Sequence, residues 1–123
     1  MSILIGPNPQ CFEGTPFFAD VCDVTIPGST TTHISFNVPP ATTRKLKKLL
    51  ITTTNDGDFE IIAGGSVIGA GRLHNTEQNV AFKFDPPRPI TAGTLVEVKF
   101  SCDSEPSISC PIKCFLSASD FIV

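Results

Sequence analysis

The chain has 123 residues, of which 41% are apolar and 17% charged, and its formal net charge is −3 with a pI near 5.2. This length suits a single domain with a core of its own. The acidic balance argues against nucleic acid as a partner, because phosphate binding usually requires an excess of Lys and Arg.

The N-terminal stretch "MSILIGPNPQ" lacks the positively charged start and long apolar run of a secretory signal peptide. No segment reaches the run of about 18 apolar residues that a membrane helix needs. We therefore expect a soluble protein that is made in the cytoplasm and has no membrane partner.

Eleven Pro, nine Gly and many Thr and Ser interrupt the chain at short intervals, which is typical of an all-β protein. The ten Phe, with no Trp or Tyr, favour core packing over ligand stacking. Strand-like runs occur at Phe17–Ile26, Thr32–Val38, Lys45–Thr54, Asp58–Ala63, Ser66–Arg72, Asn79–Phe84, Leu95–Cys102 and Ser109–Leu116.

Several of these runs alternate between apolar and polar residues, most clearly from Val96 to Cys102 and from Val80 to Phe84. Sheets that are apolar on one side must bury those sides against each other. We predict an antiparallel β-sandwich or jelly roll of about eight strands. It spans residues 1–123 as one domain, with an N-terminal arm at 1–12 and a C-terminal tail at 117–123.

The run at Lys45–Thr54 belongs to "TTRKLKKLLITTT", whose leucines also have helical spacing. A strand is favoured because its β-branched end leads into Asn55-Asp56-Gly57, a strong hairpin signal. We therefore expect this strand to pair with Asp58–Ala63. The later segment "FDPPRPI" is expected to be a rigid extended connector between strands.

The glycine-rich stretch "DFEIIAGGSVIGAGRLHN" lacks the spacing of a phosphate-binding loop and reads as a hairpin that turns at Gly64-Gly65. The predicted cross-strand pairs are Ala63 with Ser66, Ile62 with Val67, Ile61 with Ile68 and Phe59 with Ala70. Gly69 and Gly71 would then lie on a thin, open second face.

Five cysteines stand at Cys11, Cys22, Cys102, Cys110 and Cys114, so at least one is unpaired within the chain. The favoured interpretation is that they are small buried hydrophobic residues. Disulfides are the main alternative, with Cys102–Cys110 and Cys11–Cys22 as the candidate pairs.

No pattern of catalytic or metal-ligating residues stands out. The cysteines form no C-x-x-C zinc knuckle, and "NDGD" lacks the ligand order of a calcium loop. His33 and His74 lie in polar stretches, where a solvated side chain is expected. We predict no enzyme activity, no cofactor and no metal site.

Four of the nine basic residues gather at Arg44, Lys45, Lys47 and Lys48. A solvated strand edge that charge protects from aggregation is the favoured interpretation, and a contact for an acidic partner is the alternative. The chain ends are apolar and suit contacts with a neighbouring protein. The predicted partner-contact residues are therefore Ile3, Leu4, Ile5, Arg44, Lys45, Lys47, Lys48, Phe121, Ile122 and Val123.

The runs "DGDFEIIAGGSVIGAGR" and "NVAFKFDPPRPITAGTLVEVKF" resemble the compact β-sandwich proteins of tailed-bacteriophage virions, in particular small capsid decoration or cement proteins. The resemblance covers about Leu49 to Cys102. It implies a structural protein of the virion that binds an assembled lattice through the major capsid protein or another virion protein. It also implies a homo-oligomer, often a trimer, and no catalysis.

A carbohydrate- or receptor-binding module of a tail or fibre is the alternative, since jelly rolls are common scaffolds for such sites. The absence of Trp and Tyr counts against it, because sugar rings usually stack on those side chains.

Overall fold

The computed structural model describes residues 14–26, 28–74, 79–103 and 110–123. These residues form eight strands: β1 (Thr15–Thr25), β2 (Thr30–Asn37), β3 (Thr42–Thr53), β4 (Gly57–Ala63), β5 (Ser66–Leu73), β6 (Asn79–Ile90), β7 (Leu95–Cys102) and β8 (Cys110–Ile122). In this part of the chain there is no helix of the length and apolar character needed to cross a membrane.

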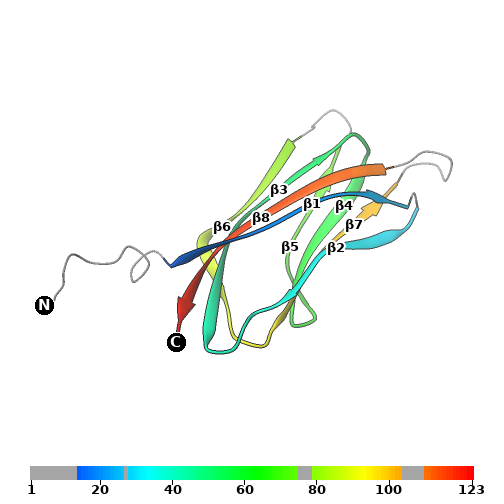
Figure 1. The fold of residues 1–123 in the computed structure, drawn as a ribbon. Coiled ribbons are helices and arrows are strands. Elements are labelled where there is room, and N and C mark those ends of the chain that lie inside the picture. Colours follow the sequence, from blue (N-terminus) through cyan, green and yellow to red (C-terminus); the bar gives the residue numbers. More distant parts are fainter. Residues whose placement is uncertain (1–13, 27, 75–78, 104–109) are drawn as a thin grey trace, which may run out of the picture.

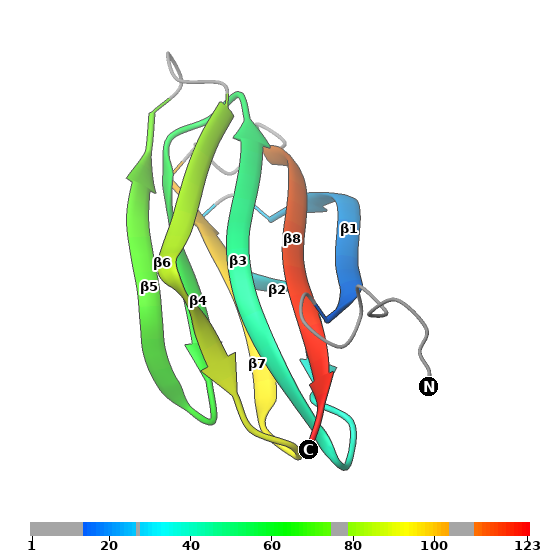
Figure 2. The ribbon, with the colours of Figure 1, turned by 90° about the vertical axis from the view of Figure 1, so that its left-hand side faces the viewer.

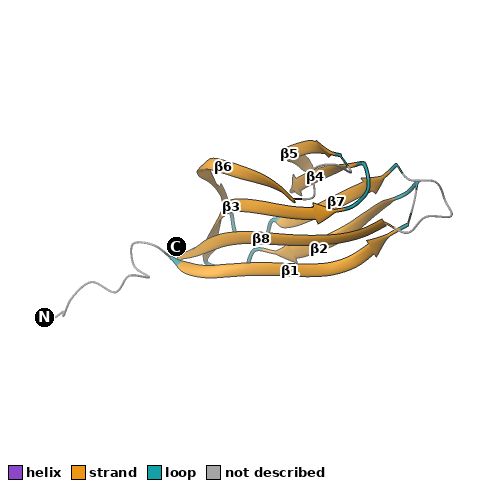
Figure 3. Cartoon of the chain, turned by 90° about the horizontal axis from the view of Figure 1, so that it is seen from above, coloured by secondary structure: helices purple, strands orange, loops and turns teal. Residues whose placement is uncertain are grey.

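The strands build two four-stranded antiparallel sheets that face each other (Figures 1 and 3). The order β1-β8-β3-β6 forms the first, called here the β8 sheet, and β2-β7-β4-β5 forms the second, the β7 sheet. Every pair of consecutive strands except β4 and β5 is split between the two sheets. This is the nested strand order of a jelly roll, so the predicted fold class is confirmed.

The core lies between the sheets and follows the predicted alternation. On β7, the side chains of Val96, Val98 and Phe100 are fully buried, whereas Glu97 and Lys99 between them are not. Each fully buried side chain of this size contributes about 1.5–3 kcal/mol relative to an exposed one. The facing β8 sheet supplies further buried side chains from β3 and β8, so the core runs the length of both sheets.

The β4–β5 hairpin turns at Gly64 and Gly65, as predicted. Both residues have positive φ, 57° and 83°, a region that glycine enters without steric cost. The first two cross-strand pairs also match the prediction: Ala63 with Ser66 and Ile62 with Val67.

Beyond these pairs the predicted register is wrong, because the ladder shifts between Ile61 and Ile62. Ile61 therefore lies opposite Gly69, and Phe59 lies opposite Gly71. A Cβ on Gly71 would lie only 2.6 Å from the Phe59 ring. The glycines thus make room for aromatic rings, and Gly69 is buried instead of lying on an open face.

The predicted hairpin between β3 and β4 is wrong, because the two strands lie in different sheets. Asn55-Asp56-Gly57 carries the chain across the sandwich, and Gly57 has no positive φ. A Cβ at Gly57 would run into the Ser101 carbonyl oxygen and the Phe100 ring. Glycine is required there for close packing and not for a turn.

The proline-rich segment after Phe84 is part of a strand and not the connector that we predicted. β6 continues to Ile90 and forms an edge of the β8 sheet, where a missing N–H group costs no ladder bond. Its register with β3 jumps from Lys48 opposite Lys83 to Leu46 opposite Arg88.

The predicted C-terminal tail at 117–123 is also wrong. β8 runs to Ile122 and pairs with β1 on one side and β3 on the other (Figure 2). Ala118 and Ser119 are buried, so this segment is integral to the sandwich. The predicted N-terminal arm at 1–12 lies outside the described residues.

A disulfide joins Cys102 at the end of β7 to Cys110 at the start of β8, with the Cα atoms 6.6 Å apart. Since β7 and β8 belong to different sheets, the bond links the two layers covalently. The favoured interpretation of unlinked cysteines is thus wrong for this pair. The interpretation as a small buried hydrophobic residue is confirmed for Cys114, which is free and buried. It is wrong for Cys22, which is free but exposed. Cys11 lies outside the described residues.

Arg44 on β3 and Asp120 on β8 form an ion pair within the β8 sheet, at the end of β8 opposite the disulfide. The Arg44 Nε and Nη2 atoms donate hydrogen bonds of 2.6 and 2.7 Å to the two carboxylate oxygens of Asp120. The guanidinium carbon lies 3.5 Å from the ring centroid of Phe17 on β1 and 4.9 Å from that of Phe36 on β2. Arg44 is only 4% exposed, so it is not part of a solvated edge.

We predict that Arg44→Ala lowers the free energy of unfolding by about 3 kcal/mol, because it leaves a partly buried carboxylate without its partner. Urea unfolding followed by circular dichroism measures this loss. Arg72→Ala is the matched control, since it removes an arginine from exposed ion pairs and should have a much smaller effect. Equal losses in the two variants would contradict the structural role of Arg44.

Candidate contact surface

The fold brings the predicted basic cluster and the predicted C-terminal contact residues together. The start of β3 pairs with the end of β8, so that Lys45 lies opposite Ser119 and Thr43 lies opposite Phe121. Val123 adds a hydrogen bond of 3.0 Å from its N–H group to the carbonyl oxygen of Ala41. The other predicted contact residues, Ile3, Leu4 and Ile5, lie outside the described residues.

At this corner a cation and apolar side chains are presented to solvent side by side. The Lys45 ammonium lies 4.8 Å from the centroid of the Phe121 ring, a cation–π contact. Ile122 is 92% exposed and Val123 is 79% exposed. The corner therefore combines a positive charge with uncovered apolar surface.

A second apolar cluster lies on the outer face of the β8 sheet. The ring of Phe18 on β1 stacks on that of Phe115 on β8 at 5.4 Å between centroids, and Phe18 is 60% exposed. Leu50 on β3 is the cross-strand partner of Phe115 and extends the cluster. The signal for it in the sequence is the adjacent pair Phe17-Phe18, since one of two neighbouring strand residues must point outward.

The basic residues are strongly concentrated on this sheet. Seven of the nine in the chain lie on β3, β6 and β8: Arg44, Lys45, Lys47, Lys48, Lys83, Arg88 and Lys113. The β7 sheet carries the other two, Arg72 and Lys99. We call the outer side of the β8 sheet the basic face; it comprises Lys45, Lys47, Lys48, Lys83 and Lys113 around Phe18, Leu50 and Phe115.

The described residues of β1, β3, β6 and β8 contain four carboxylates. One is Asp120, which pairs with the buried Arg44, and the others are Asp20, Asp23 and Asp85. The basic face is therefore locally positive although the whole chain is acidic. An exposed apolar cluster with a charged surround is typical of a protein-binding surface.

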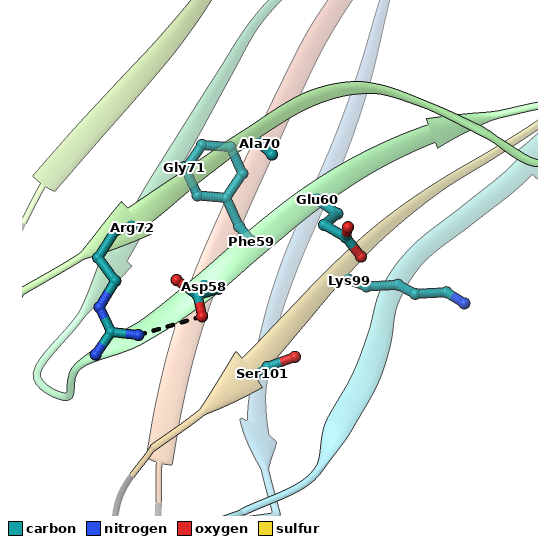
Figure 4. Close-up of a pocket in the computed structure, with 8 residues that line it drawn as sticks. All are labelled: Asp58, Phe59, Glu60, Ala70, Gly71, Arg72, Lys99 and Ser101. Carbon is teal, nitrogen blue, oxygen red and sulfur yellow. Dashed lines mark hydrogen bonds and ion pairs between the residues drawn. The ribbon is translucent and has the colours of Figure 1, made fainter.

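The outer side of the β7 sheet has a different character. It contains an open hollow of about 570 Å³ between β4, β5 and β7, shown in Figure 4. Arg72 lies at its rim and donates a hydrogen bond of 3.2 Å to Asp58 and another to Asp103. These carboxylates raise the pKa of Arg72 above its ordinary value. Both terminal nitrogens of Arg72 already donate to carboxylates, which weakens the attraction of this side chain for an anionic ligand.

His33 is buried, contrary to the prediction of a solvated side chain. The β2 ladder shifts between Thr32 and Ile34, and this irregularity turns His33 inward. Its Nε2 atom lies 2.6 Å from the Thr25 hydroxyl, and its Nδ1 atom lies 3.4 Å from an Asp23 carboxylate oxygen. His74 is exposed, as predicted.

Thr25, His33 and Asp23 resemble a hydrolytic triad, in which a carboxylate orients the histidine and the histidine activates a hydroxyl. However, the buried Nδ1 atom of His33 has no hydrogen-bond partner among the described residues, so Asp23 does not orient the ring. Thr25 has an exposed fraction of 0%, so no substrate can reach its hydroxyl. The contact instead ties β1 to β2, which are edge strands of opposite sheets. It is a structural link across the open side of the sandwich.

The described residues contain no group of three or more His, Cys, Asp and Glu side chains that could hold a metal ion. Cys114 is held away from solvent in the core, and this burial raises the pKa of its thiol to about 12.

We predict that Cys114 resists iodoacetamide at pH 8 in the folded protein, because the reactive thiolate is disfavoured and shielded. Cys22 is exposed and should be alkylated under the same conditions. Peptide mapping by mass spectrometry distinguishes the two sites, and labelling in urea provides the control in which both react. Labelling of Cys114 at a rate similar to that of Cys22 would show that the core is open at β8.

No model of a known protein family matches the chain, and no curated protein matches it in sequence. Solved structures do share the fold. A chain of the cyanophage Pam1 capsid asymmetric unit is 8% identical with a TM-score of 0.52, and the match covers 96% of this chain and 94% of that one.

Two larger proteins match with lower scores. The insecticidal delta-endotoxin Cry8Ea1 of Bacillus thuringiensis is 13% identical with a TM-score of 0.48; 86% of this chain matches but only 19% of the toxin chain. A chain of the infectious bursal disease virus Gx strain is 14% identical with a TM-score of 0.41, and the match covers 95% of this chain and 36% of that one. At these identities the likeness concerns the fold alone.

Proposed function

We propose that the chain is a structural component of a virion, and specifically a decoration or cement protein that binds and stabilises an assembled capsid. The observation that carries this proposal is the match to the Pam1 capsid chain. It covers 96% of this chain and 94% of that one, so the likeness is not confined to a part of either chain.

The surface of the molecule supports a role in protein–protein contact. The basic face places five lysines around an exposed aromatic pair, and the nearby corner exposes Ile122 and Val123. Such a surface suits a partner with an acidic rim around apolar residues. The proposed partner is the major capsid protein or another virion protein.

The covalent link between the sheets also fits a particle that leaves its host cell. Cysteines are kept reduced in the cytoplasm, so the Cys102–Cys110 bond would form mainly after release of the virion. In this proposal the protein is made in the host cytoplasm, acts as a homo-oligomer such as a trimer, and neither catalyses a reaction nor binds nucleic acid.

We predict that Phe18→Ser weakens binding to capsids at least tenfold, because it removes the most exposed ring of the aromatic cluster from the interface. Co-sedimentation with purified capsids that lack this protein gives the affinity. Val67→Ser is the matched control, since Val67 is 53% exposed on β5 of the opposite sheet. Both variants should keep the melting temperature of the parent protein.

Absence of any binding of the parent protein to capsids would overturn the decoration role. Retention on a glycan array instead would favour a carbohydrate-binding module. Equal binding by Phe18→Ser, Val67→Ser and the parent protein would leave a virion role possible but would remove the basic face as the docking surface.

A further inference from the structure

Two lysines face each other directly on the basic face. Lys48 on β3 and Lys83 on β6 are cross-strand partners in the antiparallel ladder, so their side chains project from the same side of the sheet. Like charges in this position repel and destabilise the pair of strands. Neither lysine has an ion-pair partner within the described part of the chain.

A third lysine joins them because both strands are irregular at this point. The register jump between Leu46 and Lys48 takes Lys47 out of the regular ladder, and the residues of β6 after Lys83 bulge away from it. The result is an open hollow of about 440 Å³. Its lining is Lys47, Lys48, Lys83, Phe84, Asp85, Pro87 and Ser117.

The chemistry of this lining favours a carboxylate over a phosphate. Phosphate sites usually combine lysine charges with backbone N–H groups or with the forked donors of arginine. Pro86 and Pro87 have no N–H group, and no described arginine lines the hollow. Phe84 and Pro87 provide an apolar wall that suits the methylene stem of a Glu side chain, and the single Asp85 reduces the attraction for a multiply charged phosphate.

We propose that this hollow, the lysine pocket, receives acidic side chains of a partner protein, with Lys47, Lys48 and Lys83 as their counter-charges. The inference rests on the proposed function in that the natural partner is a protein of the capsid. The partner segment carries adjacent carboxylates next to an apolar residue. Binding adds counter-charges beside Lys48 and Lys83, which face each other with Asp85 as the single carboxylate in the lining.

The test uses the folded full chain and a synthetic hexaglutamate peptide as the probe. We expect saturable binding of the peptide at low salt, and we expect K48Q/K83Q to weaken it about tenfold because two charge contacts are lost. R72Q/K99Q is the matched control: it removes the same net charge from β5 and β7 of the opposite sheet and should weaken binding by less than twofold. Isothermal titration calorimetry measures both.

Several outcomes would overturn the proposal. Equal weakening by the two double variants would mean that the peptide responds only to net charge. Tighter binding of pyrophosphate than of hexaglutamate would identify an oxyanion site instead. If the parent protein did not bind the peptide at all, the pocket would not be a site for acidic segments.

Capsid binding separates this inference from the proposed function. If K48Q/K83Q binds capsids as well as R72Q/K99Q does, the lysine pocket is wrong while the decoration role stands. If the peptide result is as expected but capsids bind neither the parent nor the variants, the pocket stands and the decoration role is wrong.

Discussion

The bidentate pair of Arg44 and Asp120 is the constraint around which one end of the sandwich is organised. A charged guanidinium in the interior is tolerable only if its hydrogen bonds are satisfied and its faces are covered. Asp120 on the neighbouring strand satisfies the first requirement, and Phe17 and Phe36, one from each sheet, satisfy the second. The pair therefore fixes both the register of β3 against β8 and the approach of the two sheets.

This register decides what the outside of the molecule presents. With Arg44 pointing inward, Lys45 must point outward, and a slip of one residue would exchange them. Arg44 is therefore buried together with Asp120, whereas the lysines of β3 lie on the surface beside those of β6 and β8. The concentration of positive charge on one face of an acidic protein follows from this division. It is also the basis on which a protein partner is proposed.

Local patterns in the sequence predict the strands well and their neighbours less well. The alternation on β7 and the Gly64-Gly65 turn depend on adjacent residues, so both are readable from the sequence. Whether Asn55-Asp56-Gly57 makes a hairpin or a crossing between sheets depends on which strands the distant β7 and β8 select. No residue near this segment indicates which of the two connections forms.

The same limit applies to the site. The lysines of β3 are visible as a cluster in the sequence, but the burial of Arg44 depends on Asp120, 76 positions away. The lysine pocket likewise needs Lys83 and the bulge of β6, neither of which is near β3 in the chain. The apolar ends were expected to be separate arms, whereas residues 117–122 belong to the central strand β8, in which Ala118 and Ser119 are buried.

The position of β8 has a consequence for folding. β8 lies between β1 and β3, and β1 has no other hydrogen-bonded neighbour in its sheet. Until β8 is in place, β1 has no strand to pair with in its own sheet, and the apolar side of that sheet stays incomplete. Closure therefore joins segments almost a hundred residues apart in the chain, and such distant pairings are slow to form. During that interval the uncovered apolar surface favours aggregation.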